Sequence, residues 1–209
     1  MGGKWWQLSI AKCTRVRRRW HWRPLPSRGP PDPRGGSGRV IEIGCGTGHN
    51  LLHYSWGKVD SLEVTEPDPF MLRRAAARAA TLDPAARTKV TLNEAPAEVL
   101  PFPDASFDTA VATLVLCTVS DLDRALAEIR RVLRPGGQLR IVEHVKAGGT
   151  TARVQRIVQP VYGWVAAGCQ LSRETESAVA RQGFDLEVTQ RTTMGGPLWP
   201  TFAGVATKA

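Results

Sequence analysis

The sequence of 209 residues contains little cysteine. Its cysteines form neither a C-x-x-C pair nor the spacing of a metal-binding cluster. The four positions are Cys13, Cys45, Cys117 and Cys169. Because extracellular disulfide frameworks have closely patterned cysteines, we expect a protein of a reducing compartment. The pattern therefore predicts a cytoplasmic location, no disulfides and no metal site.

Long hydrophobic runs are also missing. The longest, AVATLVLCTV at residues 110–119, is well short of the roughly 18 residues that a membrane-spanning helix needs. We expect it to form a central strand and the turn that follows. No apolar segment follows the basic N-terminus, so the sequence does not predict a secretory signal.

Acidic residues are scarce in the first 39 positions, which hold ten Lys and Arg against one acid, Asp32. Residues 40–209 hold 18 basic and 18 acidic residues, so the net charge of +9 belongs to the N-terminal end. Residues 1–37 are rich in Trp, Arg, Pro and Gly, which predicts a disordered extension before a domain at 38–209. Because Trp and Arg are interleaved in this extension, the sequence leaves open a weak contact of the extension with a membrane surface.

The stretch RVIEIGCGTGHNL at 39–51 is the most informative part of the chain. Residues 39–43 predict a buried strand, and Gly44, Gly46 and Gly48 follow at a turn into a helix. Glycines at such a turn let the backbone approach a ligand without Cβ clashes. Because nucleotide-like cofactors lie across the carboxyl end of a parallel sheet, this turn is the predicted cofactor site.

The glycine spacing distinguishes between cofactors. A dinucleotide site needs a third glycine where this chain has His49, which disfavours a nicotinamide-dependent dehydrogenase. The pattern G-x-G-x-G with an acid two residues before it resembles motif I of the class I S-adenosylmethionine-dependent methyltransferases. The resemblance implies S-adenosylmethionine as the cofactor. The binding residues predicted in this motif are Glu42, Gly44, Cys45, Gly46 and Gly48.

An acidic residue after the second predicted strand is the next candidate contact. Glu66 lies 18 residues after Gly48, where a carboxylate can accept hydrogen bonds from both ribose hydroxyls. Pro67 stiffens the turn that follows it. We therefore assign both residues to the cofactor site.

The segment EAPAEVLPFPDASFD at 94–108 resembles the methyltransferase segment whose backbone passes the adenine. The resemblance adds Ala97 and Glu98 to the predicted cofactor contacts. Thr113 and Leu114 close the fourth strand, where the transferable methyl group is expected.

The methyl acceptor is predicted from the residues beyond the fourth strand. No N/D-P-P-Y/F motif stands there, so the sequence predicts no nucleic-acid partner. The site is expected to be apolar, with Cys117 as its one polarisable group, which favours a small-molecule acceptor. His144 closes the fifth strand and is the candidate catalytic base, the alternative being a hydrogen-bonded histidine at the rim.

Strands and helices are predicted to alternate along the domain. The expected strands are 39–43, 61–65, 90–93, 108–113, 138–143, 185–189 and 203–207, and the expected longer helices are 69–80, 122–133 and 173–182. Residues 152–171 show no regular pattern. This alternation indicates an α/β, doubly wound and mostly parallel sheet. The resemblance implies a Rossmann-like sheet of seven strands with an antiparallel C-terminal strand.

Several segments resemble one branch of this superfamily, the thiol S-methyltransferases. They are TLVLCTV at 113–119, ALAEIRRVLRPGG at 125–137, EHV at 143–145 and GCQLSRET at 168–175. This resemblance implies transfer of a methyl group to a small thiol. A quinone or a phospholipid head group is the alternative acceptor. A non-catalytic module that binds nucleic acid through its basic tail is disfavoured by the neutral core and by the pair Glu42 and Glu66.

Overall fold

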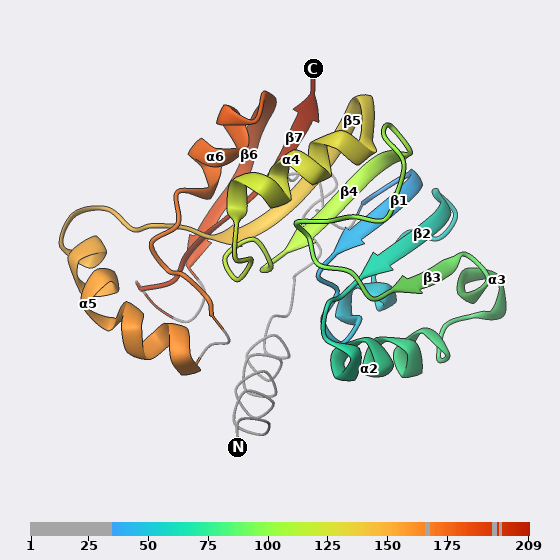
Figure 1. Cartoon of the computed structure of the whole chain (residues 1–209), viewed down its shortest axis with the longest axis horizontal. Helices are drawn as coiled ribbons and strands as arrows, with labels where there is room; N and C mark the ends of the chain where they lie inside the picture. The colour runs from blue at the N-terminus through green and yellow to red at the C-terminus, as the bar shows by residue number, and fades with distance from the viewer. Residues whose placement is uncertain (1–34, 166–167, 194–195, 197) are drawn as a thin grey trace.

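The computed structural model describes residues 35–165, 168–193, 196 and 198–209. The predicted extension at 1–37 falls almost wholly outside this range, so its disorder and its membrane contact stay predictions. The described residues form one seven-stranded sheet with helices packed against it (Figure 1). The order of the strands is β3-β2-β1-β4-β5-β7-β6.

The sheet confirms the predicted architecture. Its strands are β1 (Gly38–Ile43), β2 (Val59–Thr65), β3 (Val90–Asn93), β4 (Phe107–Thr113), β5 (Leu133–His144), β6 (Phe184–Thr193) and β7 (Pro200–Lys208). The first five pair in parallel, whereas β7 lies antiparallel between β5 and β6. In Figure 1, β7 runs toward the C-terminus at the top, opposite to the neighbouring β5. Parallel strands place the ends of β1, β2, β4 and β5 at one edge of the sheet, where the predicted site residues lie.

Strand β5 begins earlier than predicted. The sequence indicated that Arg134 to Gly137 separate a helix from a strand at 138–143, but pairing already begins at Leu133, opposite Phe107. The register then shifts, because Thr109 pairs with Gln138. Gly136, with a φ of 73°, accommodates this irregularity without a Cβ penalty.

The helices are η1 (His49–Leu52), α2 (Pro69–Ala79), α3 (Pro84–Arg87), α4 (Leu122–Val132), α5 (Gly149–Val165) and α6 (Thr175–Arg181). Helix α2 begins as predicted, because Asp68 accepts hydrogen bonds from the backbone of Phe70 and Met71. Helix α6 begins later than predicted. Its N-cap is Glu174, which makes no side-chain capping bond, so the predicted start at residue 173 is wrong.

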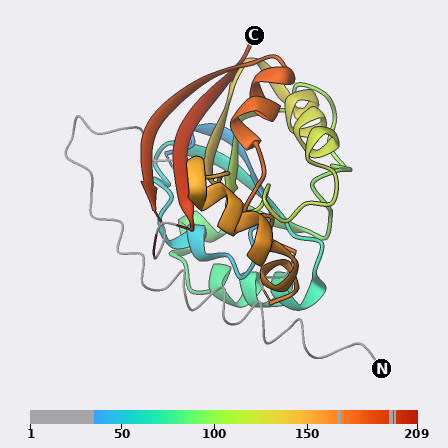
Figure 2. The same ribbon diagram turned by 90° about the vertical axis from the view of Figure 1, so that its left-hand side faces the viewer.

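Two hydrophobic clusters hold the layers together. Alternation along β1 divides its side chains between the two faces of the sheet. Ile41 and Ile43 pack in the larger cluster with α4 and α6, whereas Val40 packs in the smaller one with η1 and α2. Figure 2 shows α4 and α6 together on one side of the sheet. Burial on both faces explains why the central strands are almost wholly apolar.

Helix α5 is the largest departure from the sequence prediction, which found no regular pattern at 152–171. The side chains that dock it are amides, not apolar groups. Gln155 is fully buried and bonds with Ala147 and Leu198, and Gln159 bonds with Cys169 and Leu171. The docked side of α5 therefore lacks the apolar period by which a buried helix face is usually predicted.

The composition of α5 also argued against a helix, since it contains Pro160, which removes one helical hydrogen bond. Tertiary contacts overcome that cost. No helix in the described part of the chain combines the length and hydropathy that a membrane crossing requires.

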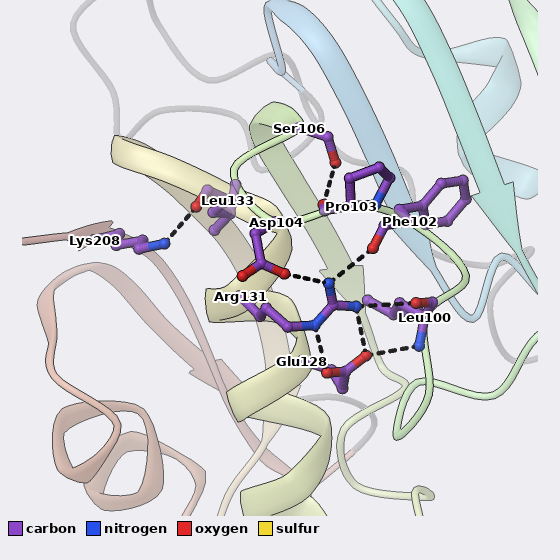
Figure 3. Close-up of polar contacts among 9 residues, drawn as sticks. All are labelled: Leu100, Phe102, Pro103, Asp104, Ser106, Glu128, Arg131, Leu133 and Lys208. Atoms are coloured by element: carbon purple, nitrogen blue, oxygen red, sulfur yellow. Dashed lines mark hydrogen bonds and ion pairs between the residues drawn. The ribbon is translucent and has the colours of Figure 1, made fainter.

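A partly exposed guanidinium network ties α4 to the segment predicted to pass the adenine (Figure 3). Arg131 forms a two-point ion pair with Glu128, at 2.7 and 2.9 Å. It also donates to the carbonyl oxygens of Leu100 and Phe102, at 3.0 and 2.8 Å, and to Asp104 at 2.8 Å. The hydrogen bonds that Arg131 donates to Glu128 and to Asp104 raise the pKa of Arg131 above its usual range. This network fixes the path of residues 100–104.

Arg131→Ala is expected to reduce the free energy of unfolding by about 1–3 kcal/mol, because two carbonyl groups and two carboxylates lose the donor that Arg131 supplies. Chemical denaturation followed by circular dichroism measures the change. Arg134→Ala is the matched control. It removes an exposed ion pair with Asp108, for which we expect a loss of at most about 1 kcal/mol. Equal losses in both variants would show that the network does not stabilise the fold.

Candidate active site

The glycine turn lies directly after β1, where the sequence predicts it. Gly44, Gly46 and Gly48 have φ values of 60°, 58° and 71°, a region that favours glycine. A Cβ on Gly44 would lie 2.2 Å from a methyl group of Val115. The turn therefore needs glycine both for its backbone and for close packing against the residues that follow β4.

Glu66 meets this turn directly. Its carboxylate accepts one hydrogen bond from the backbone N–H of Gly46 at 2.8 Å and another from that of Asp68 at 3.1 Å. Pro67 lies between Glu66 and its second donor, Asp68. Two segments that the sequence assigned separately to one cofactor are thus joined by a hydrogen bond. A carboxylate accepts about four hydrogen bonds, so two backbone donors leave it able to accept from a ligand.

Glu42 is buried and bonded by side chains that the sequence analysis missed. Its oxygens accept hydrogen bonds from Asn50 at 3.0 Å and from Tyr54 at 2.9 Å. Asn50 also donates to the hydroxyl of Thr113 at 3.2 Å. The carboxylate therefore links the start of the turn to the end of β4. The sequence signal was available, because a buried acid needs partners and both residues lie just beyond the turn.

The other predicted cofactor residues lie along the same edge with different surroundings. Leu114 has a φ of 54°, unusual for a residue other than glycine, and its N–H bonds with Val142. Ala97 is buried in the larger core cluster. The Glu98 carboxylate bonds with Ser120 and Asp121, which lowers its pKa against the effect of burial.

Three sulfur and imidazole groups gather where β4 and β5 end. The sequence predicted Cys117 as the one polarisable group here, but the fold adds Cys169, from the segment after α5, and His144. The ligand atoms of Cys117, His144 and Cys169 all lie within 4.8 Å of one another, and all three residues are buried. The Nδ1 atom of His144 lies 3.7 Å from the Sγ atom of Cys169. Linear spacing could not reveal this group.

The two thiols of this group are electrostatically distinct. A hydrogen bond from Cys117 lowers the pKa of Cys169, and His144 and Arg173 act in the same direction against burial. The pKa of Cys117 is raised well above its usual value by the same hydrogen bond, by burial and by Glu143. Cys169 is therefore the sulfur that carries negative charge more readily.

Glu143 lies next to this group and holds the segment after β4. The carboxylate is fully buried and accepts backbone hydrogen bonds from Val115 and Leu116 at 2.7 Å each and from Cys117 at 3.2 Å. Burial raises the pKa of Glu143 to about 7, although these donors oppose the shift. The sequence analysis assigned no role to this residue.

Comparison with known proteins identifies the family. A family model described as a methyltransferase domain matches residues 41–141. Human thiol S-methyltransferase TMT1A is 36% identical over 159 residues, which cover 72% of this chain and 62% of that protein. Phosphatidylethanolamine N-methyltransferase of Cereibacter sphaeroides is 32% identical over 163 residues, which cover 75% of this chain and 74% of that protein. The chain belongs to the methyltransferase family.

A solved structure places this methyltransferase in the class I fold. A SAM-dependent methyltransferase from Methanosarcina mazei superposes with a TM-score of 0.65 at 21% identity, covering 81% of this chain and 92% of that one. Family and fold together imply S-adenosylmethionine as the cofactor. The turn at 44–48, joined to Glu66 by a hydrogen bond, fits an adenosine whose ribose needs an acceptor.

Proposed function

We propose that this methyltransferase binds S-adenosylmethionine over the turn at 44–48 and transfers the methyl group to a small thiol. The hydrogen bond between the backbone of Gly46 and Glu66 is the observation that carries the cofactor assignment. The bound cofactor supplies an electrophilic methyl group on a cationic sulfonium. The chain's own part is to hold the donor, orient the acceptor and exclude water.

Two observations favour a thiol as the acceptor. The chain is similar to human thiol S-methyltransferase TMT1A, although it spans only 62% of that protein's length. In addition, Cys117, His144 and Cys169 surround the ends of β4 and β5 with soft, polarisable atoms. An acceptor thiol must lose its proton in the reaction, and His144 is the residue to which the sequence analysis assigned that step.

An acceptor comparison tests the proposal. The full chain is incubated with labelled S-adenosylmethionine and, in separate reactions, with an alkyl thiol, a reduced quinone or phosphatidylethanolamine vesicles. We expect methyl thioether as the main product, identified by mass spectrometry. Methylation of lipid or quinone without thioether would overturn the acceptor assignment while leaving the cofactor assignment intact.

Glu66→Ala is expected to weaken the binding of S-adenosylhomocysteine by about 1–3 kcal/mol, because a ribose hydroxyl loses its charged acceptor. Isothermal titration calorimetry measures this change. Glu63→Ala is the matched control, since Glu63 lies earlier in β2 and bonds with Asn93. The control should bind as the wild type does. An equal loss in both variants would point to damage of β2 and not to a ligand contact.

A phospholipid head group is the second candidate acceptor, favoured by one surface. The exposed apolar residues of α5 follow a helical period and form a single face. They are Val154, Ile157, Val161 and Trp164, with exposed fractions of 42%, 76%, 69% and 76%. Arg153 and Arg156 are exposed on the same helix, which contains no acid. This combination is typical of a helix that lies on an anionic lipid surface.

Vesicle flotation tests this second candidate. The full chain should float with vesicles that contain anionic lipid, and Trp164→Asp should reduce the bound fraction by at least about 5-fold. Arg87→Ala, on α3, is the control for a general loss of positive charge. Flotation that is unchanged in Trp164→Asp would exclude α5 as the lipid-binding surface.

A further inference from the structure

The group formed by Cys117, His144 and Cys169 has the composition of a metal site. Their exposed fractions are 1%, 8% and 4%, so a bound ion would be shielded from water. Among the residues that the structure describes, this is where three potential ligand side chains converge. They come from the segment after β4, the end of β5 and the segment after α5, three regions far apart in the sequence.

We propose that Cys117, His144 and Cys169 bind a thiophilic divalent metal ion, best matched by Zn²⁺, with a fourth position open to the sulfur of the acceptor. Two thiolates balance the charge of the ion, so the buried site is neutral. Two cysteines and one histidine are a known ligand set for zinc sites that keep an open position. Soft thiolate donors also disfavour Mg²⁺ and Ca²⁺.

The distances are close to those of a tetrahedral site. Bonds of about 2.3 Å to sulfur and about 2.0 Å to nitrogen place sulfur and nitrogen about 3.5 Å apart, and two sulfurs about 3.8 Å apart. The Nδ1 atom of His144 and the Sγ atom of Cys169 are already separated by 3.7 Å, and no pair in the group exceeds 4.8 Å. Binding therefore requires any pair to contract by at most about 1.3 Å.

The imidazole of His144 is not satisfied by the protein alone. Its Nε2 atom is buried without a hydrogen-bond partner, and its Nδ1 atom faces only the sulfur of Cys169. A metal ion bound at Nδ1 would give that nitrogen a stronger partner than the Cys169 sulfur at 3.7 Å, while Nε2 would keep its proton.

Both cysteine segments are held in place by hydrogen bonds outside the group. Glu143 accepts bonds from three consecutive N–H groups, the last of which belongs to Cys117. Gln159 donates to the carbonyl oxygen of Cys169 at 3.0 Å and accepts from the N–H of Leu171 at 2.7 Å. The two segments also bond directly, from the N–H of Gln170 to the carbonyl oxygen of Cys117 at 2.9 Å. Such outer contacts orient ligands in metal sites.

Binding of the ion is independent of the methyl acceptor, but its role rests on the proposed function. An acceptor thiol that enters the fourth position releases its proton to solvent and binds as a thiolate. The acceptor sulfur then forms a new bond to the methyl carbon, and the electron pair of the broken bond stays on the donor sulfur. The product is a neutral thioether, a weaker ligand than the thiolate. In this assignment His144 is a ligand and not a base.

Cobalt substitution tests the site by a readout other than activity. The full chain is reduced, stripped with a chelator and titrated with Co²⁺ under anaerobic conditions. We expect saturation at one ion per chain, with sulfur-to-cobalt charge-transfer absorption and the intense d–d bands of a tetrahedral centre. Cys117→Ser and Cys169→Ser should lose these bands, and His144→Gln should change them. Cys45→Ser, which removes a buried cysteine outside the group, should keep them.

Three further measurements on the wild type keep the test decisive if a variant folds poorly. Zn²⁺ should raise the melting temperature of the wild type, and an alkyl thiol should shift the charge-transfer band of the cobalt protein. The thiol turnover of the stripped protein should fall at least about 10-fold and recover with Zn²⁺. A reduced wild type without cobalt bands, or bands that survive both serine variants, overturns the site. The site is also overturned if Cys117 and Cys169 form a disulfide in air and the reduced protein gives no cobalt spectrum.

The same measurements separate this proposal from the proposed function. Cobalt bands without thioether formation keep the metal site and remove the thiol acceptor. Thioether formation at an unchanged rate in the stripped protein removes the role of the ion in methyl transfer and keeps the acceptor.

Discussion

Gly46→Val is expected to abolish binding of S-adenosylhomocysteine, with a loss of affinity of at least about 100-fold, or about 2.7 kcal/mol. The reason is steric, because the side chain would extend into the turn over which the cofactor is proposed to lie. Gly46 also has a φ of 58°, which a β-branched residue tolerates poorly, so the turn would distort and move its N–H away from Glu66. Calorimetric titration of the full chain measures the loss.

A loss of affinity caused by backbone strain has to be distinguished from one caused by steric exclusion of the ligand. Gly136→Val is the matched control, because Gly136 has a φ of 73° and nothing lies within 4 Å of a Cβ placed there. The Gly136→Val substitution imposes the same conformational penalty near the start of β5, at the end of the strand away from the site. The control should lose stability but retain its affinity. Normal binding by Gly46→Val would exclude the turn as the cofactor site.

Glu143→Ala is expected to lower the free energy of unfolding by about 3 kcal/mol or more. The substitution leaves three buried N–H groups unsatisfied, and each costs about 1–3 kcal/mol when it loses its partner. For a chain of this size, the melting temperature should fall by roughly 6–12 °C. Thermal and chemical denaturation followed by circular dichroism provide the values.

Glu143→Gln is the control for this second prediction. One amide oxygen can still accept from Val115 and Leu116, which share a single carboxylate oxygen in the structure, while only the bond from Cys117 is lost. We expect a loss of about 1 kcal/mol, clearly below that of the alanine variant. If the alanine variant were as stable as the wild type, the carboxylate could not be what holds the segment after β4.

The parts that sequence predicted well are governed by local patterns. Residues 39–43 form a strand because their apolar alternation suits a sheet covered on both faces. The helix at 122–132 follows from its apolar period and from Asp121, whose carboxylate caps it. The glycines after β1 form the predicted turn between this strand and the helical segment that follows. The cytoplasmic location and the disordered extension stay predictions.

The parts that sequence missed depend on contacts between distant segments. Helix α5 was missed because buried Gln155 and Gln159 dock it while its apolar side chains are exposed. The group of Cys117, His144 and Cys169 was missed for a related reason, since its members are 25 or more residues apart and share no linear pattern.

The sequence by itself determined the sheet, its order of elements and the glycine turn with Glu66, because hydrophobic periodicity and glycine conformation act over a few residues. Only the tertiary structure decided which side chains meet at the carboxyl edge beyond β4 and β5. Parallel strands bring the ends of remote segments to one edge, and the side chains that meet there are selected by hydrogen bonds across the fold.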